Sequence, residues 1–117
     1  MTIKEIKELL DAEVLCCNDN LNNSVYSACG CDLMSDVLAY VKDQAVLLTG
    51  LVNPQVVRTA VMMDMVCIVF VRSKSPSEDM LKLAEDNGIV ILETEKRLYE
   101  ACGILYSNGL IDEVTKA

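Results

Sequence analysis

The sequence contains no histidine and no tryptophan, and only 4% of its residues are aromatic. Histidine is the only side chain whose unperturbed pKa lies near neutrality, so its absence removes the commonest general base and the commonest metal ligand. The sequence also lacks a glycine-rich phosphate loop with a lysine, a Gly-x-Ser-x-Gly nucleophile turn and a Cys-x-x-Cys motif. Acid-base chemistry would fall to scattered carboxylates, so we expect neither an enzyme nor a cofactor; the candidates are Asp32, Asp36, Asp64 and Glu93.

Positive charge and long apolar runs are also scarce. Ten lysines and arginines face 18 acidic residues, which gives a formal net charge of −8. Such a chain has no basic surface for nucleic acid or for an anionic membrane. The longest apolar run, residues 65–71, is too short to span a bilayer, and residues 1–5 do not resemble a secretion signal. We expect a soluble cytoplasmic protein with neither nucleic acid nor membrane as a partner.

Six cysteines are present, and in a reducing cytosol we expect free thiols rather than disulfides. Cys67 falls in an apolar strand and Cys102 on the apolar stripe of a predicted helix, which is typical of small core residues. The remaining four have adjacent or one-apart spacing, unlike zinc knuckles, and would need an all-thiolate site. Two interpretations stay open, packing or surface thiols, and an all-thiolate metal or redox protein that uses Cys16, Cys17, Cys29 and Cys31.

Three short apolar runs rich in β-branched residues indicate the centre of the fold. Residues 45–49, 66–71 and 89–92 have the pattern of strands that are buried on both faces, as in a parallel sheet. The segments between them are long enough for the crossover helices that parallel strands require. The sequence therefore predicts a single α/β domain over residues 1–117, with a mainly parallel sheet and a βαβαβ core at residues 45–93.

Capping signals place the two crossover helices. Asn53-Pro54 supplies an N-cap followed by a proline at the first helical position. Ser75 and Glu78 match a capping box, with Pro76 at the first helical position. Asn87-Gly88 predicts the end of this second helix, because glycine adopts the left-handed conformation easily.

The flanking segments predict further elements. A capping box at Thr2 and Glu5 predicts a helix ending near Asp11, followed by a strand at 13–17, a loop at 18–23 and a strand at 25–29. Asp32 and Thr94 are predicted N-caps of two more helices. The first carries Met34, Val37 and Val41 among its apolar residues, and the second ends at Asn108-Gly109, before a tail at 110–117 with weak signals.

Ligands of open parallel sheets bind beyond the carboxyl ends of the strands, where helix N-termini also point. The loop after the second core strand carries two cations and two hydroxyl groups beside a helix N-terminus, which suits a small anion. Ordinary caps and surface charges would give the same residues. The candidate ligand-binding residues are Thr49, Asn53, Ser73, Lys74 and Ser75.

The first crossover helix is apolar on more than one side. Val56 and Val57 lie near its start, and Met62, Met63 and Met65 follow near its end. Methionines of this kind fill gaps in a core, or they bury a second face against another copy of the chain. We favour a homodimer.

Several short segments match the pattern of a known domain family: residues 31–39 (CDLMSDVLA), 45–49 (AVLLT), 75–78 (SPSE), 84–89 (AEDNGI), Thr94 and 99–101 (YEA). In these segments the chain resembles the DRTGG domain family in its short stand-alone form. The resemblance implies an α/β domain like those of HPr kinase/phosphorylase, phosphate acetyltransferases and CBS-domain pyrophosphatases, where it is a non-catalytic regulatory or dimerising module. It also implies a role beside iron-only hydrogenase components in anaerobes.

The positions that give the family its name differ here. Longer members have a Gly-Asp-Arg-like segment after the first core strand, where this chain has Leu51-Val52-Asn53. They have Thr-Gly-Gly after the second, where this chain has Arg72-Ser73-Lys74. We therefore carry no binding residue over from the family, and expect a regulatory homodimer that senses a small anionic metabolite or nucleotide.

Overall fold

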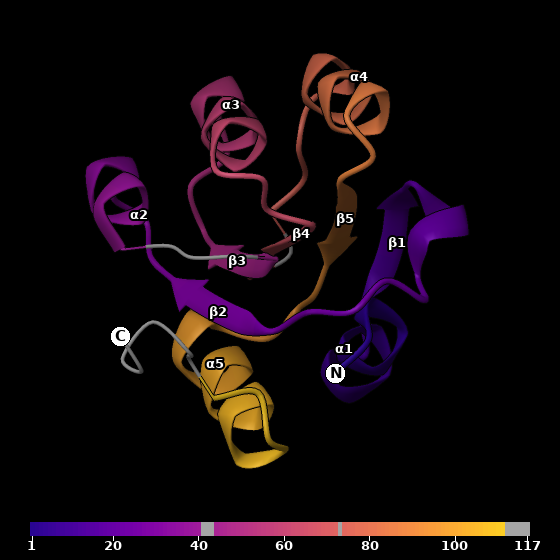
Figure 1. Cartoon of the computed structure of the whole chain (residues 1–117), viewed down its shortest axis with the longest axis vertical. Coiled ribbons are helices and arrows are strands. Elements are labelled where there is room, and N and C mark those ends of the chain that lie inside the picture. Colours follow the sequence, from indigo (N-terminus) through magenta and orange to yellow (C-terminus); the bar gives the residue numbers. More distant parts are fainter. Residues whose placement is uncertain (41–43, 73, 112–117) are drawn as a thin grey trace.

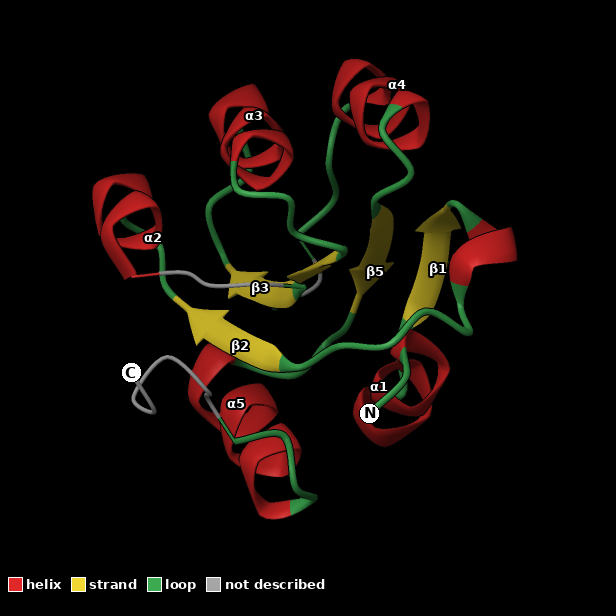
Figure 2. Cartoon of the chain, viewed as in Figure 1, coloured by secondary structure: helices red, strands yellow, loops and turns green. Residues whose placement is uncertain are grey.

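The computed structural model describes residues 1–40, 44–72 and 74–111, apart from the side chain of Tyr40. A five-stranded sheet has helices on both of its faces (Figures 1 and 2). In chain order the elements are α1 (Ile3–Leu10), β1 (Glu13–Cys16), the 3-10 helix η1 (Asn18–Asn20), β2 (Ser27–Gly30), α2 (Met34–Tyr40), β3 (Ala45–Thr49), α3 (Pro54–Met62), β4 (Cys67–Phe70), α4 (Glu78–Asp86), β5 (Val90–Glu93) and α5 (Leu98–Ser107).

The strand order is β1-β5-β4-β3-β2. Strands β2, β3, β4 and β5 are parallel, and β1 joins the edge of β5 in the antiparallel sense. The predicted α/β class and the βαβαβ core over residues 45–93 are confirmed. The strand predicted at 13–17 also forms, but its antiparallel place beside β5 is set by tertiary packing.

Alternation along the strands divides the core into two layers. Val46, Leu48 and Val69 belong to the cluster under α1 and α5, whereas Leu47 and Ile68 belong to the cluster under α2, α3 and α4. Every residue of β3 and β4 is buried. Burial on both faces explains why these strands are apolar without interruption rather than alternating with polar residues.

Two helix starts agree with the capping signals. Thr2 and Glu5 form the reciprocal capping box of α1, and Asp11 ends that helix in the left-handed conformation. The Asn53 side chain accepts a hydrogen bond from the Gln55 N–H at the start of α3. Local sequence is sufficient at these positions because no distant group competes for the capping side chains.

Three predicted caps are wrong. Helix α4 begins two residues later than expected, with Ser77 rather than Ser75 accepting the Met80 N–H. Helix α5 begins after Arg97, not after Thr94, and no side chain caps it. Asp32 does not cap α2 either. Separately from the caps, the segment predicted as a loop at 18–23 contains the short 3-10 helix η1. In each wrong cap the side chain is engaged by a residue distant in sequence, as the next subsection describes.

The apolar surface of α3 is narrower than its composition suggests. The helix packs between α2 and α4, and Val56, Val57 and Ala60 are buried. Of the methionines after them, Met65 is buried, Met63 is half-buried and Met62 is 69% exposed. Neighbouring helices therefore cover most of the second apolar side from which we predicted a homodimer contact.

Replacing two of the glycines by alanine is expected to change the stability of the fold in opposite directions. Gly88 ends α4 with φ of +70°, whereas Gly103 lies inside α5 with nothing within 4 Å of an added Cβ. We expect Gly88→Ala to lower the free energy of unfolding by about 1–2 kcal/mol, because an L side chain is strained in the left-handed conformation. Gly103→Ala should raise it by roughly 0.5–1 kcal/mol, since alanine favours a helix interior. Urea denaturation measures both, and two changes of the same sign would contradict the assignment.

Candidate ligand site at the carboxyl edge of the sheet

One edge of the sheet gathers the loops that could hold a ligand. The carboxyl ends of β2, β3, β4 and β5 lie there because these strands are parallel, and the antiparallel β1 begins there. The end of α1 reaches the same edge, where the Leu10 carbonyl accepts a hydrogen bond from Thr94 Oγ1 at 2.7 Å. Segments from the whole chain therefore meet at this edge.

Asp32 joins the loops that follow β2 and β3. Its Oδ1 accepts hydrogen bonds from Thr49 Oγ1 and from the Gly50 N–H, both at 2.8 Å. Thr49 is fully buried, and its hydroxyl in turn accepts the Leu51 N–H at 3.1 Å. The carboxylate that we predicted as a helix cap instead fixes the turn at the end of β3.

The electrostatic environment of Asp32 favours its charged form. Partial burial raises the pKa of this carboxyl, but hydrogen bonds from Gly50 and Thr49 and the positive charge of Arg72 lower it, and the net pKa is below the ordinary value. Asp32 is therefore an anion at neutral pH, with its charge directed to the end of β3.

Arg72 follows β4 and lies across the neighbouring loop. Its backbone is left-handed with φ of 59°, and its N–H donates to the Lys96 carbonyl at 2.8 Å. Its guanidinium occupies the space beside Gly50, where an added Cβ would overlap Nη2 of Arg72. Gly50 is thus required for the close approach of a cation to the Asp32–Thr49 pair.

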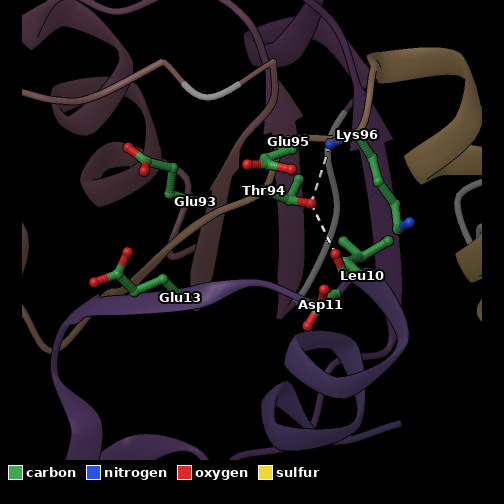
Figure 3. A pocket seen from close by; sticks show the side chains of 7 residues that line it. All are labelled: Leu10, Asp11, Glu13, Glu93, Thr94, Glu95 and Lys96. Carbon is green, nitrogen blue, oxygen red and sulfur yellow. Dashed lines mark hydrogen bonds between the residues drawn. The ribbon is translucent and has the colours of Figure 1, made fainter.

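A polar hollow of about 300 Å³ lies at the same edge beside β5 (Figure 3). Thr94 stands in its wall and accepts the Lys96 N–H at 3.3 Å. Glu93, also in the wall, accepts a hydrogen bond from the Ser75 hydroxyl at 2.7 Å, which explains why Ser75 does not cap α4. The lining residues are Leu10, Asp11, Glu13, Glu93, Thr94, Glu95 and Lys96.

The predicted ligand-binding residues have different roles in the structure. Thr49 is buried and bonded to Asp32, Asn53 caps α3, and Ser75 is bonded to Glu93. Lys74 is exposed, and Ser73 lies outside the described residues. Sequence analysis did not select Gly50 or Arg72 as site residues, because the contact between them depends on the order of strands in the sheet.

The four cysteines of the all-thiolate hypothesis do not come together. Cys16 ends β1 and Cys17 follows it, whereas Cys29 lies in β2 and Cys31 follows β2, at the opposite edge of the sheet. Three strands separate the pairs, and strands are spaced about 4.8 Å apart. One metal ion cannot bind all four thiols of one chain. The hypothesis of a single metal site formed by Cys16, Cys17, Cys29 and Cys31 of one chain is therefore wrong.

The thiols also differ from metal or redox ligands in their environment. Burial raises the pKa of Cys16 to about 12, and Cys16 donates a hydrogen bond to the Ile89 carbonyl. No disulfide joins any of the six cysteines, all of which lie in described segments. Within the described residues, no group of three or more cysteine, aspartate or glutamate side chains is arranged to hold a metal ion. Buried Cys67 agrees with its predicted core role.

Comparison with known proteins defines the class of this domain. The model of the DRTGG domain family matches residues 5–107. The chain therefore belongs to the DRTGG domain family, as its sequence motifs indicated. No curated protein matches the chain. No helix among the described residues has both the length and the apolar character needed to cross a membrane.

A solved structure has a similar fold. It contains the CBS and DRTGG domains of the regulatory region of Clostridium perfringens pyrophosphatase, in complex with the activator diadenosine tetraphosphate. The TM-score is 0.74 at 13% sequence identity, which establishes a shared fold. The match covers 89% of this chain but 45% of the other, so this chain spans less than half of that regulatory region.

The Asp32 contacts predict a pH-dependent contribution to stability. Because the folded-state pKa of Asp32 is below the ordinary value of 3.8, its carboxylate stabilises the fold above that pH. This contribution is lost as the pH falls through the lower folded-state pKa. The difference in unfolding free energy between wild type and Asp32→Asn should therefore be largest near neutral pH and shrink in acid, as urea denaturation across pH would measure.

Thr49→Val provides the control for this prediction. It removes one donor to Asp32 and leaves the Gly50 N–H in place. We compare the loss of unfolding free energy that Asp32→Asn causes in the Thr49→Val background with the loss that it causes in wild type. The loss should be smaller in the Thr49→Val background, because a donor that favours the carboxylate is missing there. A gap that is independent of both pH and Thr49 would contradict the assigned role of Asp32.

Proposed function

We propose that this chain is a non-enzymatic regulatory domain that binds a small anionic metabolite or nucleotide at the carboxyl edge of its sheet. The observation that carries the proposal is the position of Arg72. Its guanidinium lies beside Gly50, at the point where the loops after β2, β3 and β4 meet. A cation at the carboxyl edge of a parallel sheet is suited to an anionic ligand.

The distribution of charge supports an anion. The chain has a net charge of −8, yet four of its ten basic residues stand in the two loops that follow β4 and β5. These are Arg72, Lys74, Lys96 and Arg97. The N-termini of α3 and α4 follow β3 and β4 at the same edge, and the positive ends of their dipoles add to this local field. Asp32 and Glu93 are already bonded to protein donors, which reduces their repulsion of an incoming anion. Because the hollow beside β5 is lined by four carboxylates, Asp11, Glu13, Glu93 and Glu95, we place the anion on the Arg72 side of the edge and not in that hollow.

Two observations favour a nucleotide among small anions. The pyrophosphatase regulatory region with the same fold is complexed with a dinucleotide activator, diadenosine tetraphosphate. In this chain, Tyr99 lies in the first turn of α5, two residues after Arg97, and is 93% exposed. An exposed aromatic ring close to a cation can stack on a base while the cation pairs with phosphate.

The residues at this edge support the proposal of a regulatory rather than a catalytic role. The chain has no histidine, and the carboxylates of Asp32 and Glu93 accept hydrogen bonds that fix the loops. The role beside iron-only hydrogenase components, the cytoplasmic location and the homodimer remain predictions. We include the homodimer in the proposal, because a regulatory domain that pairs two copies can transmit ligand binding through their interface.

The first test is thermal unfolding of the reduced, metal-free protein with nucleotides, acyl phosphates, inorganic pyrophosphate and divalent metals. A ligand at about one hundred times its dissociation constant should stabilise the fold by roughly 2.7 kcal/mol, a shift of several degrees in a domain this small. We expect such a shift with an anionic class. No shift with any compound would contradict ligand binding and leave protein association as the function.

Arg72→Ala should abolish most of this shift, because it removes the cation beside Gly50. Lys4→Ala is a matched control that removes one positive charge from the first turn of α1, at the end of the helix opposite to the Leu10–Thr94 contact. The control should leave the shift unchanged. Equal losses in the two variants would show that net charge, and not the site, controls binding.

Tyr99→Ala separates a nucleotide from other anions. If the ring stacks on a base, the variant should weaken nucleotide binding by about 1–3 kcal/mol and leave the affinity for inorganic pyrophosphate unchanged. Calorimetric titration of both ligands measures the difference. Met62→Ala is the control, because Met62 is an apolar side chain that is 69% exposed at the carboxyl end of α3, away from Arg97 and Tyr99. Equal binding of nucleotide by wild type and Tyr99→Ala would exclude the stacking role.

A further inference from the structure

The exposed apolar side chains are concentrated at one edge of the sheet. Seven large apolar residues are exposed in the described part of the chain, and five of them lie in, or within four residues of, β2, α2 and the carboxyl end of α5. The other two are Met62 in α3 and Tyr99 at the amino end of α5. Figure 1 shows β2 at the outer edge of the sheet, between α2 on one face and α5 on the other. We name this surface the β2 edge, formed by Tyr26, Leu33, Leu38, Tyr106 and Ile111.

The β2 edge is also poor in charge. Neither residues 24–31 nor residues 101–111 contain a lysine, arginine, aspartate or glutamate, and on the α2 side residues 33–40 carry one charge, that of the exposed Asp36. Elsewhere the chain is strongly acidic, with a net charge of −8. Two copies of such a chain repel each other over most of their surfaces, and the repulsion is weakest where charges are absent.

The two edges of the sheet differ in their protection against association. At β1, the pairing with β5 has an irregular register between Val14 and Cys16, and the strand begins with the charged residue Glu13. Bulges and charges of this kind prevent association between edges. The pairing of β2 with β3 has an unbroken register, and β2 contains no charge and no proline. Among the described residues, these protective features are found at the β1 edge and not at the β2 edge.

An apolar hollow of about 130 Å³ lies on the α5 side of the same edge. Its wall includes Gly30, where an added Cβ would overlap the Cys102 sulfur, so α5 approaches the strand closely here. Exposed Tyr106 stands at the rim. The remaining lining residues are Ala28, Leu48, Leu105 and Leu110.

We infer that a second copy of this chain docks on the β2 edge, with β2 next to its equivalent around a two-fold axis perpendicular to the sheet. This axis places α2 beside the partner's α2 on one face and α5 beside the partner's α5 on the other. The same apolar surface of each copy then faces that of the other, as an isologous interface requires. The inference rests on the homodimer in the proposed function and names its interface.

The exposed area agrees with this partner. Two tyrosines and three aliphatic side chains, each about half exposed, offer on the order of 500 Å² of apolar surface. A stable interface buries roughly 800 Å² per partner, of which the apolar centre is the larger part. The β2 edge therefore supplies the centre, and the polar atoms of α2 and α5 supply the rim.

The test is the association state of Leu33→Glu and Tyr106→Glu, one variant on each side of β2. Both side chains are more than half exposed, so a folded monomer should accept a carboxylate at either position. Met62→Glu is the matched control, because Met62 is 69% exposed on α3, away from β2. Sedimentation velocity across a dilution series measures the dimer dissociation constant, and circular dichroism verifies that each variant is folded.

We expect wild type at twice the monomer mass of 12.9 kDa. Each edge variant should raise the dimer dissociation constant by at least about tenfold, the change that follows from losing an interface residue worth more than 1 kcal/mol. Met62→Glu should match wild type. If one edge variant fails to fold, the other decides the test.

A wild-type protein that is monomeric at every concentration would overturn the inference. A dimer that Met62→Glu weakens, or that neither edge variant weakens, would also overturn it. Thermal shifts with nucleotide on the same samples separate this result from the ligand proposal, because a monomeric edge variant that still binds nucleotide isolates dimerisation from ligand binding.

Discussion

The fold depends on the burial of β3 and β4 on both faces. All the residues of these two strands are buried, and their alternate side chains enter two separate core layers. A strand covered on both sides needs helices on both faces. The crossover helices α2, α3 and α4 cover one face because successive right-handed crossovers fall on the same side, and α1 and α5 cover the other face. The same constraint places the carboxyl ends of four strands together at one edge.

That edge is held by polar contacts between segments distant in sequence. Asp32 joins the ends of β2 and β3, Arg72 bonds to the carbonyl of Lys96, and Thr94 joins the end of β5 to the end of α1. Each contact uses a group that would otherwise be an unsatisfied polar atom near a buried strand end. The loops are thus fixed by the contacts that also position the backbone of Arg72.

Sequence and structure agree where a signal is local. The Thr2–Glu5 capping box, the Asn53 cap and the left-handed Gly88 were all predicted, because each depends on residues within one turn. The candidate site was predicted in part. Thr49 lies in the Asp32 cluster, but Gly50 and Arg72 were missed because their contact joins the loops after two neighbouring strands, between residues 22 positions apart in the chain.

The errors have a common physical cause. Ser75, Asp32 and Thr94 are all good cap residues, yet each makes a hydrogen bond with a group at least 17 residues away instead. The side chain of a serine, threonine or aspartate can cap a helix or form a hydrogen bond with a distant residue equally well. The local sequence does not show which of these two roles the side chain takes. The cysteine pairs show the same limit of local sequence patterns. The spacing of Cys16, Cys17, Cys29 and Cys31 in the sequence does not reveal that three strands of the sheet separate the two pairs.

The sequence by itself determined the α/β class, the parallel core over residues 45–93 and membership of the DRTGG domain family. These features follow from hydrophobic pattern and local motifs, which act over a few residues. Only the tertiary structure decided the antiparallel position of β1, the Asp32–Thr49–Arg72 cluster and the apolar edge at β2. These depend on the order of the strands, since that order decides which distant loops become neighbours and which strand is left at the edge.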